Sequence, residues 1–144
     1  MDDIAPPKDQ KTESLLDTPE TTEFRRVILE SPFRAPEGPD RARIEARHVA
    51  YARAAMRDCL FRGEAPMASH LLYTQDGVLD DEDDLERRIG IHAGLAFGAA
   101  ASATVVYADL GVSTGMKLGV ERANQEGRIV EWRSLPGWAS DEHR

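Results

Sequence analysis

The chain has 144 residues, of which 41% are hydrophobic, and this size suits a single domain with a modest core. Its formal net charge of −8 argues against a nucleic-acid backbone or an anionic membrane as the main partner, because both attract basic surfaces. The only cysteine is Cys59, which excludes an internal disulfide and a tetrathiolate metal site.

The composition also bears on where the protein acts. No apolar stretch approaches the ~20 residues of a membrane span, and the first residues lack the pattern of a signal peptide. We therefore expect a cytoplasmic protein. Residues 1–23 are rich in acids and prolines and lack apolar periodicity, which predicts a disordered acidic tail. We expect one α/β domain over residues 24–135 and a C-terminal tail over residues 136–144.

Strands and helices are predicted to alternate along this domain. The first strand begins at Arg25 or Arg26, contains the apolar run Val27 to Leu29, and stops at Ser31 and Pro32. A proline-rich loop then leads into a helix over residues 40–62, which Gly63 ends. The expected inner stripe of this helix is Val49, Ala52, Met56, Cys59 and Leu60. A second strand is predicted over residues 66–72.

The second half of the domain continues the alternation. The acids Asp80 to Asp84 precede a helix over residues 84–98, whose expected inner face is Leu85, Ile89, His92 and Ala96. A third strand over residues 103–108 is rich in β-branched and aromatic side chains. A third helix over residues 114–126, with Ser113 as its N-cap, and a fourth strand over residues 129–133 complete the pattern.

This alternation predicts right-handed βαβ units and a parallel sheet that is covered on both faces. The expected fold is a small flavodoxin-like or Rossmann-like three-layer sandwich with a four- to five-stranded, mainly parallel sheet. In such sheets the ligand lies beyond the carboxyl ends of the strands. The candidate contact residues are therefore Glu30, Ser31, Phe33, Arg34, Ser69, His70, Tyr73, Asp109, Ser113, Gly115 and Met116.

The segment from Tyr107 to Ala123 reads as a buried strand, an aspartate, a Gly/Ser turn and a helix. Unpaired N–H groups at the start of that helix can bind an anion, while Asp109 contacts another part of the same ligand. Arg34 together with Ser31 and Ser113 would form a phosphate pocket. The alternative is that Ser113 only caps its helix and that Arg34 is a solvated loop charge.

Three further side chains have more than one interpretation each. Glu30 follows an apolar strand, where a carboxylate is costly unless it is paired or used, so it is a ligand contact or catalyst unless Arg34 or Arg53 neutralises it. Asp109 is a ligand contact or a loop cap. His70 is a general acid, a stacking partner or a structural residue. The other histidines share no metal-ligand spacing, and we expect no metal ion and no cofactor.

Two segments carry a family resemblance. The turn SPFR (Ser31 to Arg34) and the segment GMKLG (Gly115 to Gly119) resemble loops of the nucleoside 2-deoxyribosyltransferase and deoxynucleotide N-hydrolase superfamily. The resemblance covers Val27 to Trp132 and implies binding of a nucleotide or nucleoside. Four segments are also similar to a group of uncharacterised bacteriophage proteins, namely ESPF, RDCLFRGEAPMASHLLYTQ, GIHAGLAFG and DLGVSTGMKLG. Members of the superfamily often complete their pockets with a neighbouring subunit, so the resemblance implies a homodimer or larger assembly.

The resemblance breaks at the residue that matters most for chemistry. The middle of the family segment G-x-E-L-G is the nucleophilic glutamate, and here that position is Lys117. An ammonium group cannot form the glycosyl ester, so Glu30 or Glu86 would have to act instead. Lys117 could still help to hold phosphate. The candidate interface for an assembly is the helix over residues 84–98, through Ile91, Leu95 and Phe97.

Three functions are therefore compatible with the sequence. The first is an N-glycosidase or deoxyribosyltransferase of altered mechanism, in which Glu30 or Asp109 does the acid/base or nucleophilic work. The second is a nucleotide binder without catalysis, which could sequester a signal in a phage setting. The third is a phospho-acceptor domain that uses Asp109, although receiver domains need an acidic pair after the first strand and this chain offers only Glu30.

Overall fold

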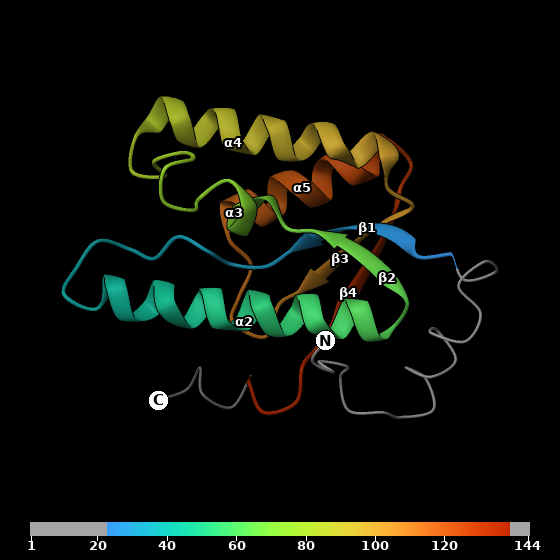
Figure 1. The fold of residues 1–144 in the computed structure, drawn as a ribbon, viewed down its shortest axis with the longest axis horizontal. Coiled ribbons are helices and arrows are strands. Elements are labelled where there is room, and N and C mark those ends of the chain that lie inside the picture. Colours follow the sequence, from blue (N-terminus) through green and yellow to red (C-terminus); the bar gives the residue numbers. More distant parts are fainter. Residues whose placement is uncertain (1–22, 139–144) are drawn as a thin grey trace, which may run out of the picture.

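A four-stranded parallel sheet forms the centre of the protein (Figure 1). The computed structural model describes residues 23–138, so the expected disordered tail and the end of the C-terminal tail lie outside the described residues. The strands stand in the order β2-β1-β3-β4. Their bounds are Arg25–Glu30 for β1, Glu64–Met67 for β2, Ala103–Tyr107 for β3 and Ile129–Arg133 for β4.

Helices cover both faces of this sheet, which confirms the predicted three-layer α/β fold. One face carries α2 (Arg41–Phe61), and the other carries α4 (Asp84–Phe97) and α5 (Thr114–Gln125) (Figure 1). The short helix α3 (Ser69–Leu72) follows β2, and the 3-10 helix η1 (Gly98–Ala100) follows α4. Because β2 and β3 lie on opposite sides of β1, the strand order reverses beside β1, which is where open α/β sheets bind ligands.

The core lies between the sheet and α2. Alternate residues of a strand point to opposite faces, so Val27 and Leu29 of β1 face α2. They pack there against a stripe of α2 that differs in part from the expected one: Tyr51, Ala52, Ala55 and Cys59 are buried, whereas Leu60 is 44% exposed. The small alanine side chains let the helix approach the sheet closely. Ile28 and Glu30 consequently face the opposite layer, toward α4.

The second strand is shorter than predicted. It ends at Met67, and the backbone N–H groups of Leu71 and Leu72 both donate to the carbonyl of Ala68, which begins α3. The prediction of a strand over residues 66–72 was therefore wrong for Ser69 to Leu72. The apolar run in this segment is compatible with either structure, and contact with the core through Leu71 fits the helix.

The predicted orientation of α4 was also wrong. Its inner face carries Gly90 and Gly94, and the residues expected to face inward are turned to solvent, with Leu85 58% and Ile89 49% exposed. The glycines recur every four residues and so share one face of the helix, where their lack of a side chain permits close approach to neighbouring groups. Ile91 and Leu95, expected at an interface, line a cavity, while Phe97 is exposed.

Buried ion pairs join the edges of the sheet on the α2 side. The Arg133 guanidinium of β4 donates two hydrogen bonds of 2.7 Å to the Glu64 carboxylate of β2 and a third to Glu131. Burial alone would raise the pKa of Glu64, but the bonds from Arg133 outweigh it and hold the pKa below the ordinary value. These contacts satisfy the charges and mark the cluster as structural. Between residues 23 and 138, no helix is both long and apolar enough to cross a membrane.

Candidate functional site

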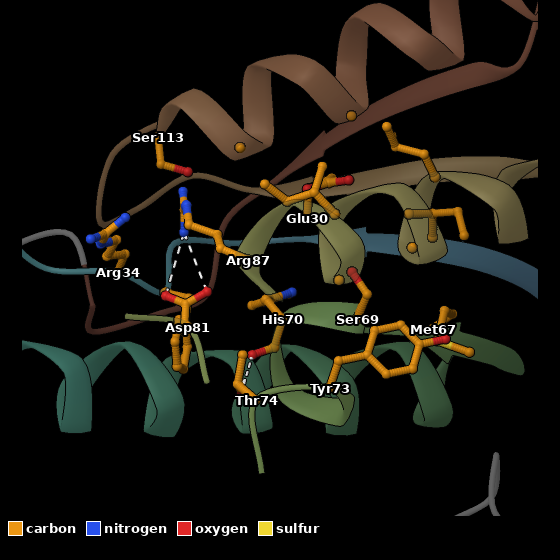
Figure 2. A pocket seen from close by; sticks show the side chains of 18 of the residues that line it. Glu30, Arg34, Met67, Ser69, His70, Tyr73, Thr74, Asp81, Arg87 and Ser113 are labelled. Carbon is orange, nitrogen blue, oxygen red and sulfur yellow. Dashed lines mark hydrogen bonds and ion pairs between the residues drawn. The ribbon is translucent and has the colours of Figure 1, made fainter. Parts of the chain in front are cut away.

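A cavity lies under α4 at the carboxyl ends of β1 and β2 (Figure 2). Its floor is formed by Ile28 and Glu30 of β1, its roof by α4, and one wall by the start of α5. The residues from the loops and helices around it that carry polar groups are Ser31, Arg34, Ser69, His70, Tyr73, Thr74, Asp81, Glu86, Arg87, Ser113 and Arg128. The cavity therefore occupies the position that the reversal of strand order predicts.

Glycines create the space for its polar groups. A Cβ atom at Gly94 would lie 2.4 Å from Ser69 Oγ, and one at Gly119 would lie 2.0 Å from Glu30 Oε2. A Cβ atom at Gly98 would lie 2.6 Å from Arg128 Nη2. Real Cβ atoms do not approach so closely, so each glycine leaves room for one polar side chain. Gly94 of α4, Gly98 of η1 and Gly119 of α5 thus each lie against a polar side chain that lines the cavity.

Glu30 is the most unusual group in the cavity. It ends β1, and its carboxyl forms no hydrogen bond or ion pair with any residue between 23 and 138. Burial raises its pKa to about 8, and the positive charge of Arg128 opposes this shift only in part. The carboxyl is therefore mostly protonated at neutral pH and can donate a proton to a bound molecule.

Arg128 forms its hydrogen bonds with groups other than Glu30. Its guanidinium donates to the carbonyl of Gly98 at 2.7 Å, to Thr104 Oγ1 at 3.1 Å and to Glu126 Oε1 at 2.7 Å. Its side chain is 6% exposed. The charge is consequently shared with Glu126, and three hydrogen bonds hold the guanidinium in the lining of the cavity.

Ser31 and His70 form a second polar pair. Ser31 Oγ lies 2.7 Å from His70 Nε2, and Ser31 is buried. Burial lowers the pKa of His70 to about 4, so the imidazole is neutral at physiological pH. This hydrogen bond joins the end of β1 to α3 and fixes the ring at the edge of the cavity.

One end of the cavity is cationic. Arg34 and Arg87 lie there close to Ser113, as Figure 2 shows. Ser113 caps α5, because its Oγ accepts a hydrogen bond of 3.2 Å from the N–H of Met116, which confirms the predicted N-cap. Arg34 forms no ion pair with the described residues, whereas Arg87 contacts Asp81 at 3.4 Å. Two guanidinium groups at a helix N-terminus suit an anion.

The other end is largely apolar. Met67 and Tyr73 lie there beyond Ser69 (Figure 2). Ile91 and Leu95 of α4 add apolar surface to the lining. A flat ring system is the kind of group that such a surface accepts, with the aromatic ring of Tyr73 available for stacking.

Most of the predicted site residues come together in this cavity. Those that line it are Glu30, Ser31, Phe33, Arg34, Ser69, His70, Tyr73, Ser113 and Gly115. Three predicted residues do not line it, namely Asp109, Met116 and Lys117. Met116 is buried in the core, and Lys117 is exposed on the far side of α5 from Gly115 and Gly119.

Asp109 has a different role from the predicted one. Its Oδ2 accepts a hydrogen bond of 2.8 Å from the Tyr51 hydroxyl and one of 2.7 Å from the N–H of Leu135. The N–H of Asp109 donates in turn to the Tyr51 oxygen. Asp109 therefore ties the end of β3 to α2 and to the segment after β4, which matches its alternative interpretation as a loop cap.

Several lining residues were not found from the sequence. They are Met67, Asp81, Arg87, Ile91, Leu95 and Arg128. Four of these six residues lie on α4 or in the loop before it, so their positions depend on how α4 is turned. The available signal was the spacing of Gly90, Gly94 and Gly98, which places three glycines on one helix face. Arg128 carried no signal, because a charged residue before a strand is common on protein surfaces.

The described residues also bear on metal binding and family membership. Between Glu23 and Trp138, no group of three or more His, Cys, Asp or Glu side chains is arranged to hold a metal ion. No curated protein and no solved structure matches the chain. Residues 25–133 match the family described as "Domain of unknown function (DUF7768)", and because this match covers most of the chain, the chain belongs to that family.

Proposed function

We propose that the cavity binds a nucleotide and that the protein cleaves the N-glycosidic bond of a (deoxy)nucleotide, with Glu30 as the acid. The observation that carries this proposal is the unpartnered Glu30 carboxyl, whose pKa of about 8 keeps it protonated at neutral pH. A buried carboxyl without a partner is costly to the fold, which favours a role in binding or chemistry.

The order of groups along the cavity fits a nucleotide. A 5′-phosphate would lie between Arg34, Arg87 and Ser113, and the base would lie against Met67 and Tyr73. Glu30 and Ser69 lie between these two ends (Figure 2). The bond between sugar and base would then pass close to the Glu30 carboxyl.

The chemistry follows from the protonated state of Glu30. Its O–H gives a proton to a nitrogen of the departing base as the bond to the sugar carbon breaks, and the bonding electrons leave with the base. Water adds to the sugar carbon and releases a proton, which returns Glu30 to its acid form. Lys117 is exposed and does not line the cavity, so α5 supplies no nucleophile from the position that the resembled superfamily uses. We therefore expect hydrolysis and not transfer to a second base.

A nucleotide binder without catalysis is the second candidate. It is favoured by the state of the other carboxylates in the cavity: Asp81 is paired with Arg87, and Glu86 accepts a hydrogen bond of 2.8 Å from the N–H of Asp80. Both carboxylates thus already interact with neighbouring groups. In this case the protein would hold a nucleotide intact.

A panel of nucleosides, deoxynucleotides and cyclic dinucleotides tests the shared claim of nucleotide binding. Ligand at about 100 times its Kd stabilises the folded state by about 2.7 kcal/mol and raises the unfolding temperature, whether or not chemistry occurs. Arg34→Ala should reduce this shift for phosphorylated ligands only. An unchanged unfolding temperature with every nucleotide would contradict both candidate functions.

We also propose that the protein forms a homodimer through the outer face of α4. Leu85, Ile89 and Phe97 are 58%, 49% and 45% exposed on that helix. Apolar side chains exposed along one helix are typical of a surface that another molecule covers.

A further inference from the structure

We propose that Asp81 competes with the anionic group of the ligand for Arg87, and that it thereby limits how much negative charge the cationic end of the cavity accepts. The inference rests on the proposed nucleotide site and adds a residue that sets its charge preference. Asp81 belongs to the loop between α3 and α4, and Arg87 belongs to the second turn of α4.

The geometry places Asp81 where it opposes the binding of an anion. Figure 2 shows the Arg87 guanidinium between Ser113 on one side and the Asp81 carboxylate on the other, with Arg34 close by. Asp81 itself lines the cavity, and its side chain is 19% exposed. An anion that reaches Arg34 and Ser113 therefore meets an arginine whose charge is already shared with a carboxylate.

The Asp81–Arg87 contact is loose enough to exchange. One nitrogen, Arg87 Nη1, lies 3.4 Å from each of the two Asp81 oxygens. The structural pair of the same protein is different, because Arg133 and Glu64 form two parallel bonds of 2.7 Å and both side chains are almost fully buried. Strong charge-assisted bonds measure about 2.7–2.9 Å. A phosphate oxygen could therefore displace Asp81 from Arg87 at small cost.

The same contact could instead hold Arg87 in the correct orientation for the ligand, and the two roles predict opposite effects. If Asp81 competes, its removal strengthens anion binding, since a neighbouring negative charge disappears and Arg87 becomes free. If Asp81 orients Arg87, its removal weakens anion binding.

Asp81→Asn tests the competition directly, with inorganic phosphate and deoxynucleoside 5′-monophosphates as probes in isothermal titration calorimetry. We expect the variant to bind both probes roughly two- to fivefold more tightly than the natural chain, as for the loss of a partly exposed ion pair. The unphosphorylated deoxynucleosides should bind equally to both proteins. Asp76→Asn is the matched control, because it removes the same charge from an exposed position of the same loop. It should leave all affinities unchanged.

Two further variants keep the test decisive. Arg87→Gln added to Asp81→Asn should abolish the gain, because the gain requires a free Arg87. Asp81→Ser serves if Asp81→Asn fails to fold as judged by circular dichroism. The inference is overturned if the Asp81 variants bind phosphate and nucleotides with unchanged or lower affinity. It is also overturned if the variants bind no phosphate at all. The nucleotide panel tests the proposed function separately. If the natural protein binds nucleotides and Asp81→Asn binds them with the same affinity, the proposed function stands and only the inference is overturned.

Discussion

At the scale of single residues, Glu30 connects the fold to the proposed chemistry. The alternation of β1 turns Ile28 and Glu30 toward α4, while Val27 and Leu29 enter the core. The Glu30 carboxyl then lies against Gly119, which has no side chain to fill that space. The positive charge of Arg128 acts on this carboxyl. Burial raises its pKa to about 8 although the charge of Arg128 acts in the opposite direction, which suits the carboxyl to proton donation and not to nucleophilic attack.

Glu30→Gln should make the protein more stable and less active. Below the ordinary pKa of 4.5 the Glu30 carboxyl is protonated in both the folded and the unfolded chain, so it adds no penalty there. Between pH 4.5 and about 8 only the unfolded chain ionises, and the natural protein loses stability as the pH rises. At pH 7 the variant should therefore be more stable by up to about 3 kcal/mol.

Urea unfolding at several pH values measures this difference. The gain should vanish at pH 4 and grow toward pH 8. The exposed Glu121→Gln is the control and should change stability little at any pH. A Glu30→Gln variant that is less stable than the natural chain at pH 7 would show that the carboxyl is compensated by a partner.

At the scale of elements, the sequence predicted what periodicity and turns can encode. The strand over residues 129–133 and the N-cap Ser113 were found because each has a local signal. Two elements were misjudged for a physical reason. The run from Ser69 to Leu72 is apolar enough for a strand, and only its contacts with the rest of the chain make it α3. In α4 the apolar residues Leu85 and Ile89 face solvent, so the rule that such residues face the core gave the wrong orientation.

The candidate site shows the same division between local and long-range information. Ser31, Arg34 and Ser113 were found because they follow strand ends or begin a helix, which is visible in the sequence. Arg87 and Asp81 were missed because their positions depend on how α4 is turned. The Glu30 environment was only partly foreseen, since Arg128 is far from it in the sequence.

The contact of α5 with β1 gives an element-scale prediction. Gly119→Ala places a Cβ atom 2.0 Å from Glu30 Oε2, so either the helix or the carboxyl must move. We expect a loss of about 1–3 kcal/mol in unfolding free energy, as for other overpacked sites, and a loss of ligand binding.

Gly115→Ala is the matched control on the same helix, because the nearest atom to its Cβ would be Ser113 Oγ at an ordinary 3.9 Å. Its stability should be unchanged or slightly higher. Glu30→Ala in the Gly119→Ala background should restore most of the lost stability, since it removes the clashing carboxyl. Equal stability of the two glycine variants in chemical denaturation would contradict the expected cost of the contact between α5 and Glu30.

At the scale of the whole molecule, the parallel sheet separates the packed core from the candidate site. The side of the sheet that α2 covers holds the packed core and the ion pairs around Arg133, whereas the side that α4 covers holds the glycines and the unpartnered carboxyl. Stability is thus concentrated on one face of the sheet and the proposed chemistry on the other.

The proposed homodimer is tested at this scale by light scattering at micromolar concentration. The natural chain should have the mass of a dimer, and Ile89→Asp should shift it to a monomer, because a charge is placed within the exposed apolar stripe of α4. Ala50→Asp adds the same charge to an exposed position of α2, on the opposite side of the sheet, and should leave the dimer intact. A monomeric natural chain would contradict the proposed assembly.

The most direct test of the central claim is chromatography of deoxynucleotides after incubation with the natural protein and with Glu30→Gln. If Glu30 is the acid, the natural protein releases free base, the rate falls as the pH rises above about 8, and Glu30→Gln binds the same deoxynucleotide without releasing base. If both proteins bind the nucleotide and leave it intact, the protein is a nucleotide binder without this catalysis. Base release by Glu30→Gln at the natural rate would contradict the assignment of Glu30.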